Sequence, residues 1–444
     1  MNSDNMTPKE IVEYLDKYVI GQAQAKRVIA IALRNRWRRM QLDEKMAQEV
    51  TPKNILMIGS TGVGKTEIAR RLAKMMRLPF IKVEASKFTE VGYVGRDVES
   101  MVRDLAMESL ALTKKEEAEA NREKIEAYVE NKIIEKLLPP LPKGASEEKL
   151  ADYDRAFAKK QEQLANGELD NLKIEIEVSG RSIDVSTSGN VPPEMAEVQE
   201  SIIQVIGGLN KKKKKSVTVK EAKKLLEYEA QSELFNEEEI KQKALEKAQS
   251  GGIIFIDEID KVAVSANSSS RQDPSKEGVQ RDLLPIVEGS SVKTKIGNLD
   301  TDHILFIAAG AFHLSKPSDL IPELQGRFPL RVELDSLTEE TLYRILTEPE
   351  NSLIKQYIAL LAVEGIELDF KEDTLRAIAK YSALANEKTE DIGARRLHTV
   401  MERLLEDISF EADSLSGKVE VAKELVDEKL GELVESEDAT RYIL

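Results

Sequence analysis

The 444-residue sequence contains no cysteine, one tryptophan and three histidines. The lack of cysteine excludes a disulfide framework, a thiolate nucleophile and a zinc site built on cysteine sulfur. The histidines, His303, His313 and His398, are too few and too scattered to favour a metal site or a catalytic triad. The chain also lacks an apolar run of about 18 residues, which a membrane-spanning helix requires.

Positive charge is in deficit as well. The 65 lysines and arginines face 80 aspartates and glutamates, which gives a formal net charge of −15. Proteins that bind nucleic acid usually carry a basic surface, so this balance argues against such a function. The N-terminal stretch MNSDNMTPKE shows neither the charged nor the apolar region of a signal peptide. We therefore expect a cytoplasmic protein, and its length predicts two or three domains.

The segment GSTGVGKT, residues 59–66, fits the phosphate-loop pattern G-x-x-x-x-G-K-[ST] without a mismatch. It follows a short apolar run, residues 54–59, that predicts a buried parallel strand, and it precedes a predicted helix over residues 67–75. In such a loop, backbone N–H groups surround the β-phosphate of ATP, the lysine reaches the β- and γ-phosphates, and the hydroxyl ligates Mg²⁺. The predicted ATP-binding residues here are Gly62, Val63, Gly64, Lys65, Thr66 and Glu67, of which Thr66 also binds the metal. The alternative is a glycine-rich turn that matches by chance.

An acidic pair follows a second apolar run. Residues 253–256, IIFI, predict another buried strand, and Asp257 and Glu258 come directly after it. In a phosphate-loop ATPase, Asp257 would hold Mg²⁺ through water, and Glu258 would orient the attacking water. The alternative is a solvated pair of loop carboxylates. Hydrolysis, as opposed to nucleotide binding alone, depends mainly on Glu258.

Far more residues separate Thr66 from Asp257 than a compact nucleotide-binding core needs. From about residue 110 the chain is rich in lysine and glutamate, and apolar residues recur at helical spacing from Ile125 to Leu137. Residues 172–178, LKIEIEV, alternate apolar and charged side chains, and we expect them to form a hairpin with residues 182–186. The lysine run 211–215 is expected to be a solvated loop.

These features predict an α/β fold with a largely helical inserted domain. We expect the nucleotide-binding domain to comprise residues 1–109 and 246–334, with the insert at residues 110–245. A mainly helical C-terminal domain, residues 335–444, carries one short strand near residues 418–421. Further strands are expected at residues 81–84 and 304–309, and Thr7 and Glu10 predict a capped helix start.

Several separate stretches, taken in order, carry a family resemblance. They are VIGQAQAKRVIAIALRNRWRRM, GSTGVGKTEIARR, KFTEVGYVGRDVES, IIFIDEIDK, EGVQRDLLPIVEG, LIPELQGRFPLRVEL, EDIGARRLHTVMERLLE and the final RYIL. On these stretches the chain resembles the AAA+ Clp/Hsp100 unfoldases, and among them the branch that serves an HslV-type peptidase. The resemblance covers almost the whole chain and weakens only in the insert. It implies an AAA+ ATPase domain that works in a hexameric ring.

The resemblance also implies roles for further residues. Ile20, in the VIGQ stretch, would pack on the adenine, and Arg395, in GAR, would approach the γ-phosphate as the sensor-2 arginine. Arg327, in PELQGR, would act as an arginine finger in the neighbouring subunit's site, with Glu323 near the nucleotide. No residue is assigned to sensor 1, because two alanines stand where relatives often place a polar side chain.

Two stretches suggest contacts with other polypeptides. Gly92, Tyr93, Val94 and Gly95 match the family's pore loop, in which the aromatic side chain would grip a substrate chain and the glycines would let the loop move. The alternative is a tyrosine packed in a core after a turn. The terminal residues Arg441, Tyr442, Ile443 and Leu444 match a tail that docks on the peptidase, and the alternative there is a frayed chain end.

The stretch RNRWRR is interpreted more modestly. We expect Trp37 to pack near the nucleotide, and the surrounding arginines to bind phosphates or acidic neighbours. These arginines are Arg34, Arg36, Arg38 and Arg39.

The function expected from the sequence is ATP-driven unfolding of tagged or unfolded proteins for a separate HslV-type peptidase, with ATP and Mg²⁺ as cofactors. No partner nucleic acid and no membrane are expected. A stand-alone protein-remodelling chaperone and a nucleic-acid motor remain the alternatives. The chain shows no recognisable proteolytic site, so proteolysis would belong to the partner.

Overall fold

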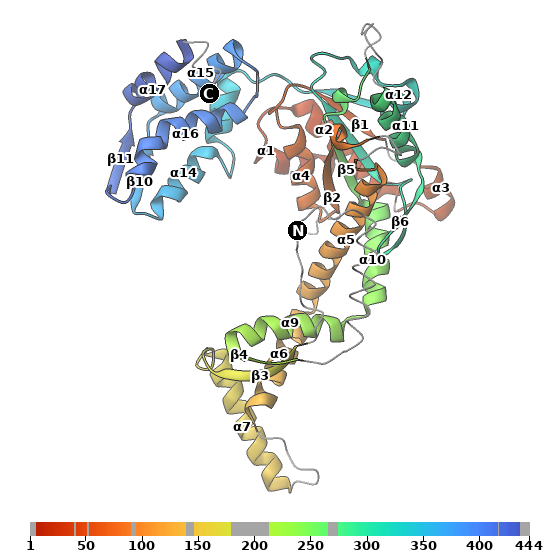
Figure 1. Ribbon diagram of the computed structural model, residues 1–444, viewed down its shortest axis with the longest axis vertical. Helices are drawn as coiled ribbons and strands as arrows, with labels where there is room; N and C mark the ends of the chain where they lie inside the picture. Colours follow the sequence, from red (N-terminus) through yellow and green to blue (C-terminus); the bar gives the residue numbers. More distant parts are fainter. Residues whose placement is uncertain are drawn as a thin grey trace. The chain divides into compact units, whose positions relative to one another are not determined.

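The computed structural model describes residues 6–39, 41–50, 53–89, 95–138, 146–178, 213–264, 274–415 and 417–435 (Figure 1). The chain folds as two compact units. The first comprises Met1–Leu112 together with Gln242–Leu444, and the second comprises Thr113–Lys241. Among the described residues, no helix combines the length and the apolar character that a membrane crossing requires.

A five-stranded parallel sheet forms the centre of the first unit. Its strand order is β2-β5-β8-β1-β9, and every neighbouring pair is parallel. The strands are β1 (Ile55–Ile58), β2 (Phe80–Glu84), β5 (Ile253–Asp257), β8 (Leu305–Gly310) and β9 (Leu330–Glu333). The first four confirm the strands predicted from the apolar runs.

Both faces of the three central strands, β1, β5 and β8, are buried, which explains why these strands have nearly continuous apolar sequences. In β1, Ile55 and Met57 join the core on one face and Leu56 joins the core on the other, as the two-residue period of a strand requires. The helices on the first face are α1 (Pro8–Asp16), α2 (Ala23–Arg39) and α4 (Lys65–Met75). Those on the second face are α5 (Glu99–Ala120), α10 (Glu237–Gly251) and α11 (Pro274–Glu288).

Helix α1 begins as predicted, with a capping box. The side chain of Thr7 accepts the N–H of Glu10, and the carboxylate of Glu10 accepts the N–H of Thr7 at 2.7 Å. Short elements complete the sheet region of the first unit. They are α3 (Glu44–Glu49), η2 (Ala85–Lys87), η3 (Ile259–Lys261), β6 (Ser291–Thr294), β7 (Gly297–Asp300), η4 (Pro317–Asp319) and α12 (Pro322–Arg327).

The C-terminal part of the first unit has a hydrophobic core of its own. Its elements are α13 (Glu339–Thr347), α14 (Leu353–Ala362), β10 (Ile366–Phe370), α15 (Glu372–Lys388), α16 (Arg395–Phe410), β11 (Gly417–Val421) and α17 (Lys423–Glu435). Strand β11 confirms the strand expected near residue 418. Its parallel partner β10 was not predicted, although Ile366 and Leu368 alternate with exposed Glu367 as in a half-buried strand.

The second unit contains the last part of α5, from Thr113 to Ala120, together with α6 (Arg122–Leu137), α7 (Glu147–Ala165), β3 (Lys173–Val178), β4 (Lys213–Thr218) and α9 (Val219–Leu234). Strand β3 pairs with β4 in antiparallel orientation, and residues 182–186, which were expected to form a hairpin with it, lie outside the described residues. One prediction is corrected: Lys213–Lys215 belong to strand β4 rather than to a loop. The register sets Ile174 opposite Val217, and both side chains are buried in the hydrophobic core of this unit.

Candidate functional site

The phosphate loop joins the carboxyl end of β1 to α4. Its first residue, Gly59, donates its backbone N–H to the carbonyl oxygen of Gly310 at 3.2 Å, which ties the loop to β8. Gly62 and Gly64 have φ angles of 78° and 103°, in the left-handed region that favours glycine. Helix α4 therefore begins at the end of the loop, where its free N–H groups and its dipole favour an anion.

Lys65 lies against this loop and is 8% exposed. Its ammonium group donates to the carbonyl oxygens of Ser60, at 2.8 Å, and Gly59. Burial lowers the pKa of Lys65, while the carboxylates of Asp257 and Asp260 oppose this shift. The ammonium group thus lies at the loop that is predicted to bind phosphate.

The acidic pair lies beside the same loop. The hydroxyl oxygen of Thr66 is 3.5 Å from Oδ2 of Asp257, so the fold brings together the two halves that are far apart in sequence. Glu258 has a φ of 55°, a left-handed conformation that is strained for a residue other than glycine. Its backbone N–H donates to Oδ1 of Asp257 at 3.0 Å. Strained backbone of this kind clusters at functional sites, and here it orients an exposed carboxylate.

Two residues of this site were missed by the sequence analysis. The ammonium group of Lys82, in β2, forms an ion pair with Asp257 at 2.7 Å. The hydroxyl of Ser86, in η2, donates to Oε2 of Glu258 at 2.9 Å. The signal for Lys82 was a lysine between two apolar residues, Ile81 and Val83, of a predicted strand. No pattern in the sequence marks Ser86, because its role depends on β2 lying next to β5.

Ile20 belongs to a segment that two buried side chains hold in place. The ammonium group of Lys26 donates to the carbonyl oxygen of Val19, at 2.5 Å, and forms an ion pair with Asp16 at 2.6 Å. The side-chain amide of Gln22 exchanges two hydrogen bonds of 2.9 Å with the backbone of Asp335. Ile20 itself is 6% exposed. No described contact links Trp37 to the phosphate loop, and its ring instead lies 3.6 Å from the guanidinium carbon of Arg34.

The segment before Arg395 packs directly on the phosphate loop. The N–H of Ala394 donates to the carbonyl oxygen of Gly62 at 3.2 Å, and the charge of Arg395 contributes to the lowered pKa of Lys65. The neighbouring Arg396 is buried and donates to the side chains of Asn386 and Thr389. The fold therefore brings Arg395 to the phosphate loop.

Arg327 and Glu323 lie on α12, one helical turn apart, and both are exposed. Helices α11 and α12 lie side by side (Figure 1), and the guanidinium of Arg327 bonds the carboxylate of Glu288, the last residue of α11, at 2.8 Å. No described contact joins either residue to the phosphate loop of the same chain. Glu67, the last residue of the predicted ATP-binding set, forms ion pairs with Arg70 and Arg71.

Most of the predicted pore loop and the whole terminal tail lie outside the described residues. Gly92, Tyr93 and Val94 belong to segment 90–94, and Arg441–Leu444 belong to segment 436–444. Next to the first segment, the N–H of Thr89 donates to the carbonyl oxygen of Arg96 at 3.2 Å. A Cβ atom on Gly95 would lie 2.2 Å from the hydroxyl oxygen of Thr89, so this close approach favours glycine.

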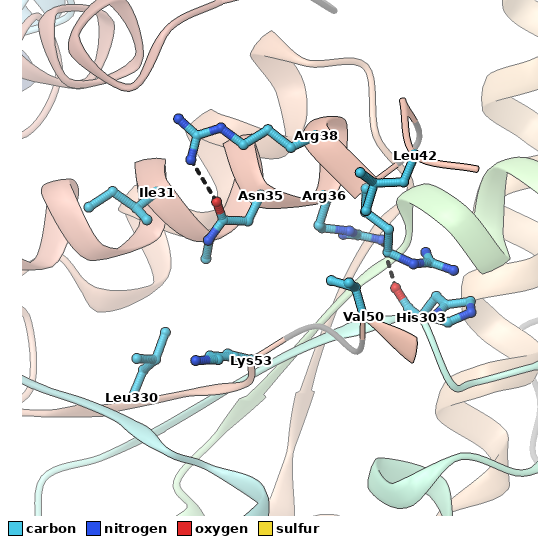
Figure 2. Close-up of a pocket in the computed structure, with 11 residues that line it drawn as sticks. Ile31, Asn35, Arg36, Arg38, Leu42, Val50, Lys53, His303 and Leu330 are labelled. Atoms are coloured by element: carbon cyan, nitrogen blue, oxygen red, sulfur yellow. Dashed lines mark hydrogen bonds between the residues drawn. The ribbon is translucent and has the colours of Figure 1, made fainter. Parts of the chain in front are cut away.

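A cavity of about 370 Å³ lies at the opposite edge of the sheet (Figure 2). It is lined by residues of α2 and by Lys53, His303 and Leu330, which stand at or just before the amino ends of β1, β8 and β9. None of the predicted nucleotide-binding residues lines it.

The described hydrogen bonds of the arginines in RNRWRR go mainly to backbone carbonyl oxygens. Arg36 donates to the carbonyl oxygens of Ser250, Gly251, Gly252 and His303. Arg39 donates to the carbonyl oxygen of Ala47, Arg38 to the side chain of Asn35, and Arg34 to the carbonyl oxygen of Met6. Arg36 thus satisfies carbonyl groups at the end of α10, which have no partner within the helix.

The oxygen donors at the phosphate loop fit Mg²⁺ bound together with a nucleotide. Mg²⁺ usually takes one or two protein oxygens and completes its shell with water and phosphate oxygens. The hydroxyl of Thr66 and the carboxylate of Asp257 supply such a pair. No group of three or more histidine, cysteine, aspartate or glutamate side chains that would form a metal cage occurs in the part of the chain that the structure describes.

Two family models match the chain. Residues 55–136 match the ATPase family associated with various cellular activities (AAA), and residues 173–331 match the AAA domain (Cdc48 subfamily). These ranges contain the phosphate loop and the acidic pair, respectively.

Full-length relatives narrow the family further. The chain is 64% identical over 441 residues, 99% of its length, to the ATP-dependent protease ATPase subunit HslU of Campylobacter jejuni subsp. jejuni serotype O:2, strain NCTC 11168, and covers 100% of that protein. It is 62% identical over 445 residues to the protein of the same name from Helicobacter pylori strain G27, with 100% of both chains covered. The chain belongs to the HslU family of ATP-dependent protease ATPase subunits, within the AAA ATPases.

Proposed function

We propose that this protein is an ATP-driven unfoldase that feeds unfolded polypeptide to a separate HslV-type peptidase and activates it. The observation that carries the proposal is the meeting of Thr66, Asp257 and the segment before Arg395 at one phosphate loop. An ATPase site needs these three parts: an anion-binding loop, a carboxylate for the metal, and a cation near the γ-phosphate. The cytoplasmic location expected from the sequence is part of the proposal.

Hydrolysis is assigned to side chains around that loop. Lys65 would bind the β- and γ-phosphates, and Thr66 and Asp257 would hold Mg²⁺, which would neutralise phosphate charge when bound. Glu258 would accept a hydrogen bond from the attacking water and orient it. Its exposed carboxylate and its bond from Ser86 suit this role. Ile20 would contact the adenine.

The position of Arg327 supports a site shared between copies of the chain. The carbonyl oxygen of Arg327 accepts a hydrogen bond from the side chain of Asn54, which lies just before the amino end of β1. The phosphate loop, in contrast, follows the carboxyl end of that strand. At about 3.3 Å per residue, the strand between them spans about 15 Å, which is longer than an arginine side chain. Arg327 would therefore act on the nucleotide of a neighbouring copy. In a closed hexameric ring, every ATP site would receive an arginine finger from the adjacent copy. Glu323, on the same helix, would approach the same nucleotide.

The contacts with substrate and peptidase are proposed from the sequence. Tyr93, with Gly92, Val94 and Gly95, would grip the substrate chain in the central pore. The tail Arg441–Leu444 would dock on the peptidase. A hydrogen bond between the backbones of Thr89 and Arg96 joins the described residues on the two sides of the segment that carries Tyr93.

The proposal is tested by degradation of a folded test protein in a mixture of this chain, an HslV-type peptidase and ATP. A matched sample contains the chain without Arg441–Leu444. We expect degradation with the full-length chain and none with the shortened chain, while both hydrolyse ATP. ATP hydrolysis without degradation in either sample would favour a remodelling chaperone. Stimulation of hydrolysis by DNA would favour a nucleic-acid motor.

A further inference from the structure

Asn54 occupies a buried position just before β1 and is 6% exposed. Its side-chain amide makes two hydrogen bonds to backbone groups that are distant in sequence. Oδ1 accepts the N–H of Phe306 at 3.0 Å, and Nδ2 donates to the carbonyl oxygen of Arg327 at 3.1 Å. One amide therefore joins the central strand β8 to the last residue of α12.

Both bonds require an amide at this position. The pairing of β1 with β8 begins at Ile55 and Ile307, so the N–H of Phe306 finds its partner in the side chain of Asn54 rather than in the strand. The carbonyl of Arg327 lies at the end of α12, where the helix itself supplies no donor. An aspartate would keep the acceptor and lose the donor, because an ionised carboxylate only accepts hydrogen bonds.

The contact with Asn54 fixes the base of the Arg327 side chain. The residue that follows, Phe328, is 1% exposed, and so is Leu324 in the preceding turn. The guanidinium, in contrast, lies at the surface, where it bonds the exposed carboxylate of Glu288. The backbone of Arg327 is thus held by buried contacts, while its side chain projects outward.

We propose that Asn54 is a positioning residue for Arg327: by holding the carbonyl at the end of α12, it sets the point from which the guanidinium reaches the nucleotide of the neighbouring copy. The inference rests on the proposed function, in which Arg327 acts between copies. Small displacements matter here, because a misplacement of about 1 Å can cost about a hundredfold in rate.

The test uses mixed rings, in which the defect can be assigned to one side of the interface. Acceptor copies carry Arg327→Ala and keep Glu258, so their ATP sites can work when a neighbouring copy supplies the arginine. Donor copies carry Glu258→Gln and keep Arg327, so they supply the arginine but hydrolyse little ATP themselves. Each preparation alone should hydrolyse ATP slowly, and mixing them should restore hydrolysis at acceptor sites that neighbour a donor. Asn54→Asp is then added either to the donor or to the acceptor copies.

We expect Asn54→Asp in the donor copies to reduce the restored rate about tenfold, with the KM for ATP unchanged. In the acceptor copies, which have no arginine finger, the same change should alter the rate by less than about twofold. Asn298→Asp in the donor copies is the matched control, since Asn298 is exposed on β7. Asn54→Ser, whose hydroxyl is too short to span both partners, repeats the test without a buried charge.

An unchanged rate with the Asn54 variants in the donor copies would overturn the inference. So would an equal loss on both sides, because that result indicates a general structural role. If Arg327→Ala copies hydrolyse ATP at the full rate by themselves, it is the proposed role of Arg327 that fails, and this outcome is visible before Asn54 is changed.

Discussion

The backbone N–H of Ala394 donates a hydrogen bond of 3.2 Å to the carbonyl oxygen of Gly62. The two loops approach so closely that a Cβ atom on Gly62 would lie 2.1 Å from the carbonyl oxygen of Ile392. A Cβ atom on Gly393 would lie 2.5 Å from the carbonyl oxygen of Thr61. Because Gly62 and Gly393 have no side chains, the backbone before Arg395 packs directly on the backbone of the phosphate loop.

Gly393→Ala tests the importance of this contact. Gly393 has a φ of 60°, so alanine would be strained by about 1–2 kcal/mol and would also push against the phosphate loop. We expect the kcat for ATP hydrolysis to fall at least about tenfold, because Arg395 would be displaced from the phosphates.

Gly365→Ala is the matched control for that variant. Gly365 has a φ of 83°, and a Cβ atom there would meet nothing within 4 Å. It should show a similar loss of stability in denaturant and a normal kcat. Equal kcat values in the two variants would contradict the role given to the contact.

Ser86→Ala tests the orientation of Glu258. The hydroxyl of Ser86 donates to the carboxylate of Glu258 at 2.9 Å. Removal of the hydroxyl would leave the Glu258 side chain less constrained without changing the charge of Glu258. We expect kcat to fall by about threefold to tenfold with little change in nucleotide affinity, as is typical when one orienting hydrogen bond is lost. Steady-state kinetics and nucleotide titration measure the two quantities. A variant that loses affinity but keeps its kcat would place Ser86 in binding instead.

Tyr18 gives a pH dependence whose sign is fixed. Its hydroxyl donates to Glu350 at 2.8 Å, and this bond, together with burial, raises the pKa of Tyr18 from 10.0 to about 12. Because the folded state holds the proton more tightly, the stabilisation is complete below pH 10.0 and is lost as the pH rises towards about 12. The advantage of the native protein over Tyr18→Phe in chemical denaturation should shrink over that range. A constant difference between the two proteins would show that the bond does not form.

Tyr93→Ala separates substrate gripping from ATP hydrolysis. Tyr93 lies in the predicted pore loop, away from the phosphate-loop motif in sequence, so basal ATP hydrolysis should remain normal. Translocation of a folded substrate should be abolished, because the aromatic surface proposed to grip the chain is lost. Unfolding at the native rate by this variant would exclude the pore-loop assignment.

Much of the fold could be predicted from local sequence, and long-range pairing could not. The apolar run before Asp257 predicts a buried strand, since both faces of the sheet are covered. Strand β4 was missed because its lysines are typical of a solvated loop, and only the pairing with β3 gives them a strand conformation. Strand β10 was missed because it is short and lies in a mainly helical region, although its apolar residues alternate with charged ones.

Likewise, some residues of the candidate site could be predicted from local sequence and others could not. Lys65 and Asp257 lie in contiguous motifs whose chemistry is evident from the residue types. Lys82 and Ser86 reach the site only because β2 lies beside β5, and Asn54 reaches Arg327 only because β1 lies beside β9. Sequence patterns do not encode these neighbours directly.

We expect ATP hydrolysis that depends on Glu258 to drive the unfolding of substrates for the peptidase. The most direct test compares the native chain with Glu258→Gln, each mixed with an HslV-type peptidase and ATP, on a short peptide and on a folded protein. We expect the variant to bind ATP and to support cleavage of the short peptide, but to lose degradation of the folded protein by at least about a hundredfold, in parallel with its ATP hydrolysis. Degradation of the folded protein at the native rate by Glu258→Gln would contradict the account.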